Sequence, residues 1–179
     1  MANDSETFVG LFPVVPSIDS LILGTTDGNV LSAQADGNIV LGFNGNDHLN
    51  STFNLTALIG GNGEDTLTTN VIVPLQSDAP MQGIAIQLGE TGNDNLNATV
   101  SLQGADRPMM PNLYLGPQGT GRADVLLDGG SGNDVINATA NVAHEAFSAA
   151  ADATVRTFVI GEVGNDTINV HADGQGGAR

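Results

Sequence analysis

Cysteine and lysine are both absent from this chain of 179 residues. Without cysteine, the chain has no disulfide bonds and no thiolate metal site. The chain has twenty acidic side chains and only four basic ones, all of them arginine, so its formal net charge is −16. Such a charge repels nucleic acids and anionic membrane surfaces, so we expect neither as a partner.

Long apolar runs are also missing. No stretch approaches the length of a transmembrane segment, and residues 1–7 lack the basic and apolar regions of a Sec secretory signal. We therefore expect no membrane insertion. The acidic composition alone would fit a disordered chain, but 40% of the residues are hydrophobic and they follow a strict pattern, which argues for one folded domain.

The 24 glycines, by contrast, are many, and they recur in one turn pattern. This turn has glycine at its first and fourth positions and aspartate at its sixth, and it occurs five times. The first-position glycines are Gly42, Gly60, Gly89, Gly129 and Gly161, and the fourth-position glycines are Gly45, Gly63, Gly92, Gly132 and Gly164. The aspartates are Asp47, Asp65, Asp94, Asp134 and Asp166.

Each turn leads into a segment in which alternate residues are apolar or small. In the second copy these residues are Leu67, Thr69, Val71 and Val73, and in the first copy the series runs from Leu49 to Leu55. The positions between them carry mainly Asn and Thr. This period of two predicts a strand with one face in the core and the other in solvent. A shorter apolar segment precedes each turn, so the unit is strand, glycine-rich turn, strand and loop.

One such unit cannot bury its apolar face, but stacked units can. The repeat therefore predicts an all-β fold, a parallel β-solenoid with irregular loop insertions. Stacking places the five aspartates in a column with a spacing of about 4.8 Å. Neighbouring carboxylates would repel by about 3 to 4 kcal/mol at an effective dielectric near 20, so we expect cations between the rungs. Carboxylates and turn carbonyls are all-oxygen ligands, which Ca²⁺ prefers.

The five turns resemble the RTX (haemolysin-type) nonapeptide repeat, Gly-Gly-x-Gly-x-Asp-x-apolar-x, over residues 39–174. The resemblance implies that calcium is held between successive turns by the five aspartates and by carbonyls of the turn glycines. It also implies a place outside the cell or on its surface, reached by type I secretion. The sequence departs from the family pattern at the second turn position, where Phe43, Glu90 and Glu162 replace glycine. The two glutamates could add oxygen ligands.

The most apolar stretch, residues 8–23, lies outside the five turns. Pro13 and Pro16 exclude a central strand and leave an edge strand or an extended arm. We expect residues 1–23 to form an N-terminal arm or cap and residues 24–179 to form the solenoid. The arm could cover its own first coil, or it could dock on another subunit through the apolar residues Phe8, Leu11, Phe12, Val14 and Val15.

Two further segments complete the chain. Residues 24–33 look like a decayed copy with Asp27 in place of the fourth-position glycine, so we expect a first coil without a metal site. Between the copies the connections lengthen to residues 77–83, 104–124 and 143–156. The last of these is rich in helix formers, which favours one short helix on the solenoid wall. Loops of this size tend to carry recognition.

Nothing in the sequence indicates an enzyme. His48, His144 and His171 lie in unlike registers, without a nucleophile or paired carboxylates beside them. Three classes of function remain. The first is a calcium-stabilised extracellular structural protein, a fibre, matrix or surface-layer subunit that assembles head to tail. The others are a binding module of a secreted adhesin, including an ice-binding one, and the accessory region of a secreted enzyme. We favour the first, because the apolar N-terminal stretch could cover the open end of another subunit.

Overall fold

We analysed a computed structural model of the chain, which describes residues 20–75, 81–104, 121–143 and 153–174. The five apolar residues of the expected arm lie outside this part of the chain, and so does most of the expected helix. Within the described residues every regular element is a strand. Accordingly, no helix that could cross a membrane occurs there.

The strands form two parallel sheets of six. Sheet A contains the odd-numbered strands β1 (Ser20–Leu23), β3 (Asn38–Asn44), β5 (Thr56–Asn62), β7 (Met81–Thr91), β9 (Gly121–Asp128) and β11 (Ala153–Ile160). Sheet B contains the even-numbered strands β2 (Val30–Ser32), β4 (His48–Ser51), β6 (Thr66–Leu75), β8 (Asn95–Gly104), β10 (Val135–Ala143) and β12 (Thr167–Gly174). Each coil thus gives one strand to each sheet, which confirms the predicted parallel β-solenoid.

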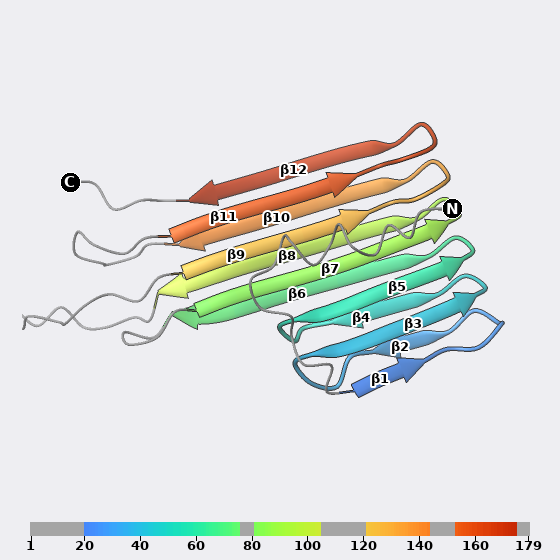
Figure 1. Ribbon diagram of the computed structural model, residues 1–179, viewed down its shortest axis with the longest axis horizontal. Helices are drawn as coiled ribbons and strands as arrows, with labels where there is room; N and C mark the ends of the chain where they lie inside the picture. Colours follow the sequence, from blue (N-terminus) through green and yellow to red (C-terminus); the bar gives the residue numbers. More distant parts are fainter. Residues whose placement is uncertain (1–19, 76–80, 105–120, 144–152, 175–179) are drawn as a thin grey trace, which may run out of the picture.

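The glycine-rich turns all lie along one edge of the stack, at the right in Figure 1. Successive turn aspartates are 18, 29, 40 and 32 residues apart in the chain, yet they occupy neighbouring rungs. The register is kept because the extra residues fall between an even strand and the next odd strand, away from this edge. The decayed copy follows the same register, since Val30 of β2 pairs with His48 of β4. Ser20–Leu23 adds the edge strand β1 to sheet A.

The core lies between the two sheets and is built in rows. Leu49, Leu67, Leu96 and Ile136 align through the parallel pairing of sheet B, and each has an exposed fraction of 0%. The predicted inward series is therefore confirmed in the second, third and fourth copies. In the first copy it was too long. β4 ends at Ser51, and Leu55 lies in a turn with φ 58°.

Sheet A differs from sheet B, because its outer face also carries a row of apolar residues, in keeping with the apolar segments expected before the turns. Leu41 of β3, Ile59 of β5 and Leu88 of β7 align in one row on this face. Their neighbours Val40 and Leu58 point into the core and are fully buried. The described strands pack face to face only through the core, so no described element covers this outer row.

Candidate metal centre

The fourth-position glycines set the shape of the turn edge. Gly63 has φ +141° and Gly92 has φ +142°, positive values that residues with side chains rarely adopt. A Cβ atom on Gly63 would also overlap the carbonyl oxygen of Gly45 in the preceding coil. Glycine is therefore required here both by its backbone conformation and by the close approach of consecutive coils.

The turn aspartates form a continuous hydrogen-bonded column. The Oδ1 atom of Asp65 accepts the backbone N–H of Asp47 at 2.7 Å, and the Oδ1 atom of Asp94 accepts that of Asp65 at 2.8 Å. Asp134 and Asp166 continue the series at 2.8 and 3.0 Å. At the start of the stack the Asn29 amide donates to Asp47 Oδ1 at 2.6 Å. Each carboxylate therefore joins its own coil to the one before it.

The second carboxylate oxygen has a different environment. The Oδ2 atoms of Asp47, Asp65, Asp94 and Asp134 are buried and have no hydrogen-bond partner. Each of these side chains belongs to a residue that is only 1% exposed. A buried polar atom without a partner costs about 1 to 3 kcal/mol, and more when it carries charge. A proton or a cation would give these oxygens the partner that the described residues do not supply.

The first-position glycines border the space beside these oxygens. A Cβ atom on Gly89 would lie 2.5 Å from Asp94 Oδ2 and 2.6 Å from the Gly129 carbonyl oxygen. A carboxylate oxygen and a main-chain oxygen of the next coil thus adjoin the same small volume, which glycine leaves open. Both are hard oxygen donors of the kind that Ca²⁺ binds. The donor chemistry fits a hard cation.

Burial and like charge act together on the column. Burial, together with the nearby carboxylates of Asp65 and Asp134, raises the pKa of Asp94 to about 7, although the hydrogen bond from the Asp65 amide lowers it. Burial is also the main cause of the raised pKa values of Asp65 and Asp134. In the interior of the column the charged carboxylate is thus disfavoured unless a positive charge lies nearby.

The structure brings together all fifteen residues that the sequence analysis assigned to the turn sites. They form a ladder in which each coil contributes one turn aspartate. Within the described residues, no group of three or more His, Cys, Asp or Glu side chains converges on one point. A cation here would therefore rely on main-chain oxygens for the rest of its ligands. Glu90 and Glu162, considered as extra ligands, are exposed, whereas the turn aspartates Asp47 to Asp134 are buried.

A second ladder was missed in the sequence. The Oδ1 atom of Asn93, at the fifth turn position, accepts the backbone N–H of Asn133 at 2.8 Å, and Asn133 Oδ1 accepts that of Asn165 at 2.9 Å. The signal was present, since Asn precedes the aspartate in four of the five turns. These side-chain amides run opposite to the aspartates, from each coil to the one after it. The ladder is interrupted at Glu64, which takes the place of asparagine in the second turn.

Comparisons with protein-family models, with curated proteins and with solved structures find no match to this chain.

Proposed function

We propose that this chain is a calcium-stabilised structural protein of the cell exterior whose solenoids assemble end to end. The observation that carries the proposal is the exposure of interior residues in the last coil that the structure describes. Ile168 and Val170 of β12 occupy interior positions, yet they are 44% and 49% exposed. Their counterparts in β10, Ile136 and Ala138, are 0% and 1% exposed. The end of the described stack thus offers a row of core residues without a cover.

The strand edges support the same proposal. Among the described strands, β11 and β12 each have a neighbour on one side only, and so do β1 and β2 at the other end. Unpaired strand edges bind other strands readily, and soluble solenoids cover them with caps or charges. A second solenoid that continued both sheets would satisfy the backbone groups and cover Ile168 and Val170 at once.

Calcium enters the proposal through the unpartnered oxygens. When bound, a divalent cation supplies positive charge that offsets the repulsion within a column of buried carboxylates. Asp47, Asp65, Asp94 and Asp134 would each offer Oδ2, while Oδ1 stays bonded to the amide of the preceding coil. The glycines keep the backbone close enough for carbonyl oxygens to complete the ligand set. The extracellular place, type I secretion and a contact through the N-terminal arm follow from the RTX resemblance and the sequence, and remain predictions.

Sedimentation velocity and electron microscopy of the full chain, in millimolar calcium and in excess chelator, test the proposal. We expect concentration-dependent filaments in calcium. Val170→Asp should reduce assembly, because it places a charge on the open end. Ile72→Asp is the matched control, since Ile72 is 54% exposed on the outer face of β6, away from the ends. A wild-type protein that stays monomeric at high concentration in calcium would contradict end-to-end assembly.

A further inference from the structure

The second turn position adopts positive φ whatever residue occupies it. Gly61 has φ 109° and Gly130 has φ 83°, as suits glycine. Phe43 and Glu90 adopt φ 79° and 76° at the same position, where a side chain is strained. Strained residues persist where the surrounding structure holds them, and they cluster at binding and catalytic sites. The presence of side chains at these two strained positions, where glycine would be unstrained, therefore suggests a functional reason.

The two strained residues flank one glycine. The parallel pairing aligns Phe43 with Gly61, and Gly61 with Glu90. A Cβ atom on Gly61 would overlap the carbonyl oxygen of Phe43, so only glycine fits between them. The missing side chain leaves a gap on the outer face of sheet A, with an aromatic ring on one side and a carboxylate on the other.

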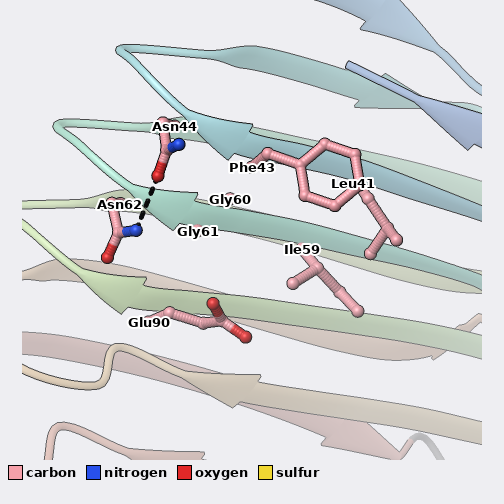
Figure 2. A pocket seen from close by; sticks show the side chains of 8 residues that line it. All are labelled: Leu41, Phe43, Asn44, Ile59, Gly60, Gly61, Asn62 and Glu90. Atoms are coloured by element: carbon pink, nitrogen blue, oxygen red, sulfur yellow. Dashed lines mark hydrogen bonds between the residues drawn. The ribbon is translucent and has the colours of Figure 1, made fainter. Parts of the chain in front are cut away.

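This gap is a pocket of about 370 Å³, which we call the Phe43–Glu90 pocket. Its lining residues are Leu41, Phe43, Asn44, Ile59, Gly60, Gly61, Asn62 and Glu90. Figure 2 shows the Phe43 ring beside Leu41, Ile59 below them, and the Glu90 carboxylate at the far side of Gly61. Phe43 is 45% exposed, so its ring is open to a ligand.

The polar groups of the pocket differ in how far they are already engaged. Asn62 Nδ2 donates to Asn44 Oδ1 at 2.7 Å, and Asn62 Oδ1 accepts the hydroxyl of Thr91. The Glu90 carboxylate has no hydrogen bond or ion pair with any described residue. The Glu90 carboxylate is thus an unengaged negative charge in a pocket that also has apolar lining residues.

We propose that the Phe43–Glu90 pocket binds an arginine side chain of a protein partner. A guanidinium group is planar, stacks on an aromatic ring and pairs with a carboxylate through two parallel hydrogen bonds. Leu41 and Ile59 provide apolar contact for the stem of the side chain. The net charge of −16 attracts basic partners over a longer range. A neutral sugar fits less well, because it carries no positive charge to pair with the Glu90 carboxylate.

The same turn position does not recreate this pocket further along the stack. Gly130 lies between Glu90 and Glu162, and the residue aligned with Leu88 in the outer row is Asp128 instead of an apolar side chain. The gap at Gly130 therefore lacks both an aromatic ring and an apolar floor. Glu162, which has φ 58° at the same turn position, serves as a matched control for Glu90.

Nuclear magnetic resonance titration of the full chain with Nα-acetyl-arginine amide tests the proposal. The citrulline analogue, which has the same shape without the charge, is the matched ligand. We expect shifts centred on the amides of Leu41, Ile59 and Gly61 with the arginine ligand. Glu90→Gln and Phe43→Gly should each weaken binding by about three- to tenfold, while Glu162→Gln leaves it unchanged.

Phe43→Gly separates binding from folding. Glycine is the natural residue at this position in the coils of Gly61 and Gly130, so the variant should unfold at the same temperature or higher. Equal binding of the citrulline analogue would overturn the proposal, because it would show that the guanidinium charge and its pairing with Glu90 contribute nothing. Equal losses for Glu162→Gln and Glu90→Gln would overturn it in favour of general attraction to an acidic surface. Equal binding of the corresponding lysine amide would overturn the assignment to arginine.

Discussion

At the scale of the residue, the two carboxylate oxygens of each turn aspartate have different environments. Oδ1 is committed to the amide of the preceding coil, whereas Oδ2 is buried without a partner in four of the coils. Substitution by alanine would remove both. Substitution by asparagine keeps an oxygen for the amide and removes only the charge, so it separates the structural bond from cation binding.

We predict that Asp94→Asn lowers the stability gained from calcium and leaves the metal-free protein as stable as the wild type, or more so, at neutral pH. The amide keeps the bond to the Asp65 N–H and ends the repulsion with Asp65 and Asp134. Each tenfold loss of calcium affinity removes about 1.4 kcal/mol of that gain at saturating metal. Thermal unfolding with and without calcium measures both effects, and identical gains for variant and wild type would show that Asp94 is no ligand.

The raised pKa of Asp94 also predicts how the metal-free protein responds to pH. The folded value is about 7 and the ordinary value is 3.8, so the folded state holds its proton longer than the unfolded state as pH rises. The stability from this group is fully present below about pH 3.8 and is lost as the pH rises to about 7. In chelator, urea unfolding should show a larger loss of stability over this range for the wild type than for Asp94→Asn. Equal pH dependence of the unfolding free energy in the two proteins would show that the pKa of Asp94 is not raised.

At the scale of the strand, alternation decides which substitutions matter. Leu96 and Asn97 are adjacent in β8 and point to opposite faces. Leu96 is 0% exposed, whereas Asn97 accepts a hydrogen bond from Asn137 on the outer surface at 2.8 Å.

We predict that Leu96→Ala costs about 2 to 5 kcal/mol of unfolding free energy, because it leaves a cavity between the sheets. Asn97→Ala should cost less than about 1.5 kcal/mol, since water can replace the lost partner. Chemical denaturation of the two variants gives the comparison. A cost for Asn97→Ala as large as that for Leu96→Ala would mean that the outer ladder carries as much stability as the core.

The strands also show which parts of the fold could be predicted from the sequence and which could not. The inward series through Leu67, Leu96 and Ile136 and the column of aspartates followed from period and spacing, because these are local signals repeated in phase. Which apolar residues of sheet A face outward did not follow, since Leu41 and Ile59 lie in short runs without visible alternation. The prediction that the strand continues to Leu55 was wrong, because the chain turns after Ser51 although apolar residues continue in the sequence. The Phe43–Glu90 pocket needs residues from three coils, which only the stacking register brings together.

At the scale of the whole molecule, contacts run mainly between neighbouring coils, as in other repeat proteins. Strand β10 pairs with β8 on one side and β12 on the other, and within the described part of the chain the last coil pairs only with the coil before it. Stability is then close to a sum of coils and the interfaces between them.

We therefore predict that a chain ending at residue 152 keeps the earlier coils folded, with a lower melting temperature than the full chain. The hydrogen bonds from Asp47 to Asp134 lie within the retained part. Circular dichroism should retain the strand signal in proportion to the remaining coils. Complete unfolding of the shortened chain would show that the solenoid behaves as one indivisible unit.

The direction of the aspartate bonds has a consequence for how the protein is made. The carboxylate that accepts the amide of a turn aspartate comes from the following coil, so Asp65 completes the turn of Asp47, and Asp94 completes that of Asp65. A chain that emerges from the ribosome or a secretion channel with its N-terminus first has to wait 18 to 40 residues for the group that closes each turn. Folding therefore trails chain growth by one coil. A chain that emerged C-terminus first would carry each closing carboxylate before the turn that needs it.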